Sequence, residues 1–283
     1  MNQPFARSFR TAAWLGWQIE SNWTDPLVFF AFSVMKPIAS VLILVFMYNT
    51  VAGTGTDDPI YAYIYLGNAF YIYVGAIMAG ASYSVLDDRE RYRTLKYLYI
   101  APISMPMYLI GRAVARFVIG TLAVVITVLV GVFFFGVPIN LSVANWPLLL
   151  VALLLGVLCL AFMGITLGAW TLTIRSEPWF LGDAVAAALY LFSGAIFPIT
   201  VLPTWLQPVG FGLPITYWLE LIRRALLGSG AAAFPTLAGF SNTQLFGILI
   251  GMTIGFGLLS VVAFRFFDRR ARDQSMIDAQ SNF

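Results

Sequence analysis

The sequence has 283 residues, of which 60% are hydrophobic and 10% are charged, with a formal net charge of +3. Its mean hydropathy of +0.85 and its long apolar runs exclude an ordinary soluble protein and predict an all-α polytopic membrane protein, because a bilayer core needs roughly 20 apolar residues in helical form. With no histidine and one cysteine, most zinc sites and histidine-based catalysis are excluded, and no basic stripe indicates a nucleic-acid partner.

The first 25 residues predict a helix that lies in the membrane interface. Phe5, Phe9 and Ala13 can share one face of this helix, whereas Arg7 and Thr11 fall on other faces. Tryptophan suits the headgroup zone of a bilayer, and three tryptophans occur here, at positions 14, 17 and 23. A helix that packs against the rest of the protein is the alternative.

Six apolar runs follow, and each predicts a transmembrane helix. They cover residues 27–51, 60–84, 107–137, 148–174, 179–197 and 245–267. The first run contains Lys36 followed by Pro37, and the proline is expected to kink the helix. Because an intramembrane charge is a functional hypothesis by default, Lys36 is a candidate for a translocation path. Snorkelling to the interface or a structural ion pair is the alternative that we favour.

The second run is rich in tyrosine. Tyr71 and Tyr73 are candidates to line a path for an amphipathic substrate. An aromatic belt at the membrane surface is an equally good interpretation of these side chains.

Lysine and arginine are concentrated in alternate loops, and this pattern predicts the orientation. Basic residues precede the first run, separate the second run from the third, and follow the sixth, whereas the loops at 52–59 and 138–147 contain none. We therefore expect six spans in a cell membrane (inner or plasma), with both termini in the cytoplasm.

The loop between the second and third runs reads LDDRERYRTLKYLYIAPIS, and seven of the ten residues 87–96 are charged. If residues 87–100 form one helix, Asp87 can pair with Arg91 and Glu90 with Arg93. The leucine and tyrosine side chains then form an apolar patch, and Pro102 ends the helix. This predicts a docking surface for a cytoplasmic partner. A solvated loop that carries topogenic positive charge is the alternative.

Residues 198–243 are too apolar for a solvated loop and too often interrupted by proline and glycine for a span. They predict helices that enter the membrane and turn back, since irregular backbone is tolerated at that depth only within protein or against a cavity. Glu220 has helical spacing to Arg223 and Arg224. We favour a self-satisfied ion pair here, and keep Glu220 and Arg224 as candidates for substrate contact.

The sequence contains no G-x-x-x-x-G-K-[ST] phosphate-binding loop, because Lys36 follows Met35 and Lys96 follows Leu95. We therefore expect no nucleotide on this chain, and any ATP-driven work needs an ATPase on another polypeptide. A secondary transporter would need carboxylates inside its predicted spans, and Asp183 is the only residue that comes near to such a position. The lack of histidine and of paired acids disfavours an intramembrane enzyme.

Two stretches resemble the ABC-2 family of transporter membrane subunits. Residues 83–115 contain an acidic-Arg-Glu group, then Thr-Leu, then Pro-Ile-Ser; residues 193–228 contain Phe-Pro, Leu-Pro-x-Trp-Leu, Leu-Pro-x-Thr-Tyr and Arg-Arg-x-Leu-Leu-Gly in that order. The likeness extends over nearly the whole chain. The stretch WQIESNWTDPLVFF before the first run is more similar to the drug-resistance and lipo-oligosaccharide exporter branch than to the polysaccharide exporters.

The resemblance implies one ABC-2 type transmembrane domain over residues 1–283. Within it, residues 1–25 would be an interfacial helix, 86–104 the cytoplasmic coupling helix region and 203–228 the re-entrant helices before the sixth span. It also implies that the chain, itself not an enzyme, pairs with an identical or paralogous permease. A separate ATP-binding cassette subunit would bind ATP and Mg²⁺.

Such a half-transporter, surrounded by membrane lipid, would export an amphipathic or hydrophobic drug, lipid or glycolipid. A polysaccharide or lipid-linked glycan is the alternative within the same family. The resemblance assigns coupling to the ATPase subunit to seven residues of the charged loop: Asp87, Asp88, Arg89, Glu90, Arg91, Arg93 and Leu95.

Overall fold

The computed structural model describes residues 3–21, 35, 38–39, 42–43, 45–48, 50, 59–101, 103–137, 139, 144–174, 179–228 and 235–274. Within these ranges all of the regular secondary structure is helical. Lys36 and most of the first predicted span lie outside the described residues.

The helices are α1 (Gln3–Ser21), α3 (Pro59–Tyr73), α4 (Gly80–Leu86), α5 (Leu95–Ile100), α6 (Met105–Phe134), α7 (Trp146–Thr171), α8 (Trp179–Phe192), α9 (Gln207–Phe211), α10 (Pro214–Leu227) and α11 (Asn242–Asp273). The second long helix along the chain is continuous but contains two π-helical segments, Val74–Ala79 and Asp87–Arg91, which follow α3 and α4 respectively.

Four of the described helical stretches are long and apolar enough to cross a membrane: Ile60–Arg91, α6, α7 and α11. Each covers one of the apolar runs in the sequence, so these four predictions of helix are confirmed. The apolar part of α8, Phe180–Phe192, is shorter. The complete arrangement of six spans stays a prediction.

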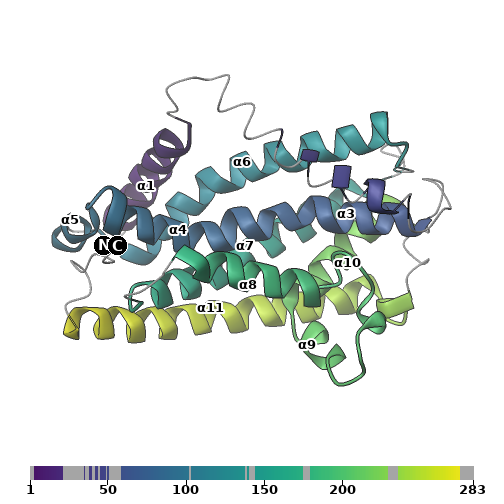
Figure 1. Cartoon of the computed structure of the whole chain (residues 1–283). Helices are drawn as coiled ribbons and strands as arrows, with labels where there is room; N and C mark the ends of the chain where they lie inside the picture. Colours follow the sequence, from purple (N-terminus) through teal and green to yellow (C-terminus); the bar gives the residue numbers. More distant parts are fainter. Residues whose placement is uncertain are drawn as a thin grey trace.

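The long helices lie side by side in one bundle, with the continuous helix Ile60–Arg91 at its centre (Figure 1). In the most apolar window of this helix 78% is buried within the protein, against 22% for that of α11. The outer helices therefore present most of their apolar surface outward, as expected for helices whose solvent is lipid.

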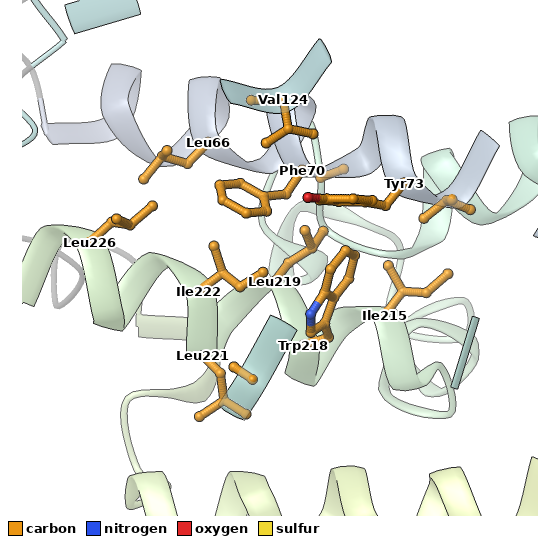
Figure 2. Close-up of a cluster of buried hydrophobic side chains, with 14 of the residues drawn as sticks. Leu66, Phe70, Tyr73, Val124, Ile215, Trp218, Leu219, Leu221, Ile222 and Leu226 are labelled. Carbon is orange, nitrogen blue, oxygen red and sulfur yellow. The ribbon is translucent and has the colours of Figure 1, made fainter. Parts of the chain in front are cut away.

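The main core lies where α10 packs against α3, with α6 and α7 beside them. Leu66, Phe70 and Tyr73 of α3 face Trp218 and Ile222 of α10 (Figure 2). At Gly156 of α7 the indole of Trp218 fills the space that a Cβ would need. The close approach of α7 and α10 therefore requires glycine at this position.

Helix α10 covers only the N-terminal half of α7. Its first residues, Pro214 and Ile215, adjoin Cys159 near the middle of α7. At its other end the Ala225 carbonyl accepts a hydrogen bond of 2.8 Å from the Asn145 N–H, just before α7 begins. This is the geometry of a helix that returns from the middle of the bundle to one end.

We call the other end the basic end; it is formed by α1, α5 and the C-terminal part of α11 (Figure 1). Here α1 crosses α6 closely, since Ala12 faces Gly111 and Gly16 faces Ala115. The packing alternative for the N-terminal helix is thus confirmed for this face. Trp14 on another face is 62% exposed, and the interfacial position of α1 stays a prediction.

The prediction of one continuous helix over residues 87–100 is wrong. Residues Asp87–Arg91 continue the central helix as a π-helical segment, and α5 begins only at Leu95. Between them the backbone turns at Arg93, whose φ of 53° is uncommon for a residue other than glycine. The Thr94 N–H closes the turn by donating to the Asp88 carbonyl at 2.8 Å.

Candidate functional site

The charged loop at the basic end divides into a buried part and an exposed part. Asp88 and Arg89 are only 2% and 4% exposed, whereas Arg91 and Arg93 are exposed. Asp87 and Glu90 are half-buried, and Leu95 is buried. A single docking surface that includes Asp88, Arg89 and Leu95 is therefore not formed; these three side chains face the protein's own helices.

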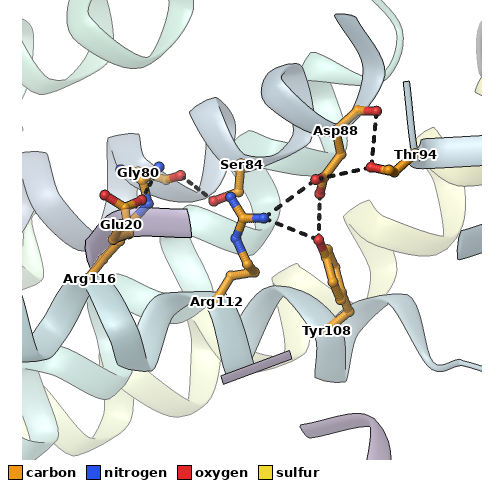
Figure 3. Close-up of polar contacts among 8 residues, drawn as sticks. All are labelled: Glu20, Gly80, Ser84, Asp88, Thr94, Tyr108, Arg112 and Arg116. Carbon is orange, nitrogen blue, oxygen red and sulfur yellow. Dashed lines mark hydrogen bonds and ion pairs between the residues drawn. The ribbon is translucent and has the colours of Figure 1, made fainter. Parts of the chain in front are cut away.

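Asp88 is the centre of a buried network between the central helix and α6 (Figure 3). The Tyr108 hydroxyl donates to Asp88 Oδ2 at 2.8 Å, and Arg112 Nη1 lies 3.4 Å from Oδ1. Arg112 also donates to the Tyr108 hydroxyl at 3.2 Å. The Thr94 hydroxyl, beyond the turn, lies 3.4 Å from Asp88 Oδ1. Because removing a charged side chain from water costs several kcal/mol, a buried charge needs an oppositely charged or hydrogen-bonding partner of this kind.

Arg89 joins the same turn to the C-terminal end of α7. Its Nη1 points at the carbonyls of Thr171 and Leu172, at 3.4 and 3.5 Å, and its Nη2 contacts Glu90 at 3.0 Å. A cation at the last carbonyls of a helix satisfies acceptors that have no partner within the helix and complements the helix dipole. Asp88 and Arg89 thus tie one turn to α6 and α7.

Helix α5 is attached to the bundle by its inner face. Leu95 is buried in the core of the basic end. The Tyr99 hydroxyl donates to Asp268 of α11 at 2.6 Å, and the Arg272 guanidinium lies 4.7 Å from the centre of the Tyr99 ring. Burial raises the pKa of Tyr99, and the adjacent Asp268 raises this pKa further, so the hydroxyl stays protonated and donates.

The outer face of α5 and the turn before it form an exposed surface of cationic and apolar side chains. Ile100 and Tyr97 are 82% and 63% exposed, and Lys96 lies over the Tyr97 ring at 5.5 Å. An exposed apolar patch with a charged rim marks an interaction site more often than a free surface. We call this the α5 surface; its residues are Arg91, Tyr92, Arg93, Lys96, Tyr97 and Ile100.

A second ion pair joins α1 to the same framework. Arg116 of α6 contacts Glu20 of α1 at 2.8 Å and lies against Gly80 of the central helix. This pair is close to the Asp88 network, as Figure 3 shows. Three elements, α1, α4 and α6, therefore meet behind the α5 surface.

The opposite end has its own polar cluster around α10. Glu220, 2% exposed, lies 2.9 Å from Arg224 and accepts a hydrogen bond of 3.3 Å from the Tyr63 hydroxyl. Arg224 also donates to the carbonyls of Leu237 and Phe240, both at 2.7 Å. The predicted Glu220–Arg224 ion pair is confirmed, while substrate contact by these residues stays a prediction.

Arg223 is more deeply buried than its neighbour. It donates to the carbonyls of Tyr63 and Gly194 at 3.0 and 2.8 Å, and its guanidinium lies 3.5 Å from the centre of the Tyr63 ring. All of these contacts are to main-chain carbonyls or to the face of an aromatic ring. Arg223 therefore fixes α10 to α3 and to the turn after α8.

The two tyrosine candidates for a path face neighbouring helices. The Tyr71 hydroxyl donates to the Ala186 carbonyl at 2.5 Å, and its ring lies 4.6 Å from that of Tyr190. Tyr73 is buried in the main core and donates to Thr121 at 2.9 Å. In the described part of the chain, these two side chains hold α3 to α8 and α6.

Two members of the Asp88 network, Tyr108 and Arg112, are not predicted from the sequence. Their spacing along α6 places both on one face, but only the fold shows that this face meets Asp88. For metal ions, no group of three or more His, Cys, Asp or Glu residues is suitably placed among the described residues.

Comparison with known proteins gives a consistent result. A family model described as ABC-2 type transporter matches residues 8–227. The chain is also 26% identical over 152 residues to proteins named probable multidrug ABC transporter permease YbhR, from Escherichia coli strain K12 and from Escherichia coli O157:H7. The matched region is 53% of this chain, and it spans 40% of the length of each of these curated relatives.

Proposed function

The chain belongs to the ABC-2 type transporter family, and we propose that it is the permease half of an ATP-driven exporter. It is a multi-pass membrane protein and the membrane subunit of an ABC transporter. Such permeases usually work with an ATP-binding subunit. The finer proposal is that ATP hydrolysed on a separate subunit drives export through this chain.

The observation that carries this proposal is that α5 packs against the bundle on one face and is exposed on the other. Its outer face is open, with Tyr97 and Ile100 exposed, while its inner face is held by Leu95 and Tyr99. A partner that pushes on the α5 surface would therefore move a helix already tied to α11. Through the turn before α5, the same push would reach α6 and α7.

The seven predicted coupling residues then have two different roles. Arg91 and Arg93 are exposed and would contact the ATPase subunit. Asp88, Arg89 and Leu95 are buried and would transmit the movement to the spans, with Asp87 and Glu90 at the boundary. Tyr97 and Ile100 join the contact residues because they are the most exposed apolar side chains of α5.

The proposed orientation is supported by the exposed cations. At the basic end Arg7, Arg10 and Lys96 are exposed, as are several arginines near the end of α11, whereas Arg223 at the opposite end is buried. By the positive-inside rule, the basic end would face the cytoplasm. Helices α9 and α10 would then be re-entrant helices on the outer side, and a second permease copy or paralogue would complete the pathway.

The substrate proposal rests on the comparisons. The similar Escherichia coli proteins are named multidrug permeases, which favours an amphipathic or hydrophobic drug, lipid or glycolipid. Lys36, Tyr71, Tyr73, Glu220 and Arg224 remain the candidates for the path. Of these, Tyr71 is only half-buried and is the first to substitute in a transport assay.

Co-purification tests the central part of the proposal. The chain would be co-expressed in turn with each ATP-binding cassette subunit of the same cell and isolated in detergent through a tag on one partner. If the proposal is right, a stable complex forms with one of these subunits, and its ATPase activity depends on both chains. Failure to form a complex with any ATP-binding cassette subunit of the same cell would contradict the proposal.

A further inference from the structure

We propose that a cavity at the basic end binds one acyl chain of an anionic phospholipid, with the lipid phosphate at Arg7. The cavity has a volume of about 390 Å³ and lies between α1, α5 and the start of α6. Its walls are mainly apolar and include Leu15, Leu98 and Ile103. This size and lining are typical of sites that hold a small hydrophobic ligand with a few polar contacts.

Burial shows which side of the cavity is the entrance. Arg7 and Thr11 line it and are exposed, whereas Ala12 and Tyr108 line it and are buried. The cavity therefore runs from a polar, cationic mouth on α1 to an apolar interior. A phospholipid changes in the same order, from a charged headgroup to an apolar hydrocarbon chain.

The charge at the mouth selects an anionic headgroup. Arg7 lines the mouth, whereas Arg10 on the same helix is exposed and does not line the cavity. Three carboxylates of this end already have partners: Glu20 is paired with Arg116, Asp88 with Arg112, and Asp268 with Tyr99. A basic patch at the membrane surface attracts anionic lipids, and none of the described residues that line this cavity carries a carboxylate.

The depth of the mouth fits a lipid as the occupant. Trp14 and Trp17 project from α1 and are exposed, and tryptophan at the surface of a membrane protein favours the headgroup level. At the inner end, the Tyr108 side chain lines the cavity while its hydroxyl holds Asp88. A bound chain would thus press α1 and α5 against the network that positions the turn. The proposal needs only that the chain lies in a membrane, so it stands independently of the proposed transport function.

Native mass spectrometry of the purified full chain, with phosphatidylglycerol or phosphatidylcholine added, tests this site. We expect one tightly retained phosphatidylglycerol per chain. Arg7→Gln should reduce the preference for phosphatidylglycerol about fivefold, the factor that one basic residue contributes at an anionic surface. The matched control Arg10→Gln removes an exposed cation of the same helix that does not line the cavity, and it should retain the preference.

Blocking variants separate the cavity from general surface attraction. Ile103→Trp should fill the interior and lower the retention of phosphatidylglycerol, and the exposed position of Thr11 makes Thr11→Trp a second block that leaves the core intact. Thermal unfolding in the same detergent identifies variants that fail to fold. Equal loss with Arg7→Gln and Arg10→Gln, equal retention of phosphatidylcholine, or full retention with Thr11→Trp would overturn the proposal.

Discussion

Asp88 and Arg223, which are buried at opposite ends of the bundle, have different kinds of partners. At the basic end, Asp88 is held mainly by the side chains of Tyr108 and Arg112. At the opposite end, Arg223 is held by main-chain carbonyls and by the face of the Tyr63 ring. Asp88 thus takes part in a charge balance between side chains, whereas Arg223 holds main-chain carbonyls in place.

This difference indicates which end is built to rearrange. Hydrogen bonds between side chains can exchange partners when a turn shifts, whereas main-chain acceptors keep their positions unless the backbone itself moves. The basic end also carries the exposed α5 surface. We therefore infer that α10 is locked to α3, while the turn at residues 92–94 serves as a joint between α5 and the spans.

The largest loss of folding stability is expected from Asp88→Ala. This change leaves the Arg112 guanidinium buried without its carboxylate, and breaking a buried ion pair in this way costs about 3–5 kcal/mol. The double variant Asp88→Ala with Arg112→Met removes both charges and should recover most of the loss. Unfolding of the purified chain in detergent measures both. A double variant that is no more stable than Asp88→Ala would show that side-chain charge balance is not what holds this end together.

A smaller loss of folding stability is expected from Arg223→Met, and no second substitution is expected to recover it. Each buried acceptor left without a donor costs about 1–3 kcal/mol, and no second substitution can remove the carbonyls of Tyr63 and Gly194. The control Arg272→Met removes an arginine whose side chain is 55% exposed in its ion pair with Asp268, and it should cost less than about 1 kcal/mol because exposed ion pairs contribute little to stability. Equal losses for the two variants would contradict the lock assigned to Arg223.

The smallest effect is expected from Tyr99→Phe. The substitution removes one hydrogen bond, worth about 1 kcal/mol, and Asp268 keeps Arg272 at 3.2 Å as a partner. Hydrogen exchange should increase in residues 95–100 and stay unchanged in α10. Faster exchange throughout the bundle would mean that α5 is not a separately attached element.

Much of the fold followed from hydropathy. The four apolar runs that became long helices were predictable because lipid requires continuous apolar helix, and proline and glycine correctly marked residues 198–243 as broken. The Glu220–Arg224 pair was predictable because both residues lie on one helix at i,i+4 spacing.

The break in the charged loop was not predictable in the same way. Local spacing predicted pairs of Asp87 with Arg91 and of Glu90 with Arg93. The structure instead shows Asp88 against Arg112 and Arg89 against the end of α7, which are tertiary contacts. The turn at Arg93 also lacks the glycine or asparagine that usually announces a positive φ.

The association of the chain with the proposed ATP-binding cassette subunit tests the role of the α5 surface most directly. The dissociation constant would be measured for the parent chain, for Ile100→Asp on the α5 surface, and for the matched control Val201→Asp between α8 and α9; Ile100 is 82% exposed and Val201 is 68% exposed. We predict that Ile100→Asp weakens binding about tenfold or more, equivalent to about 1.4 kcal/mol, while Val201→Asp leaves it unchanged. Unchanged binding with Ile100→Asp, or equal weakening with both variants, would contradict the role of the α5 surface.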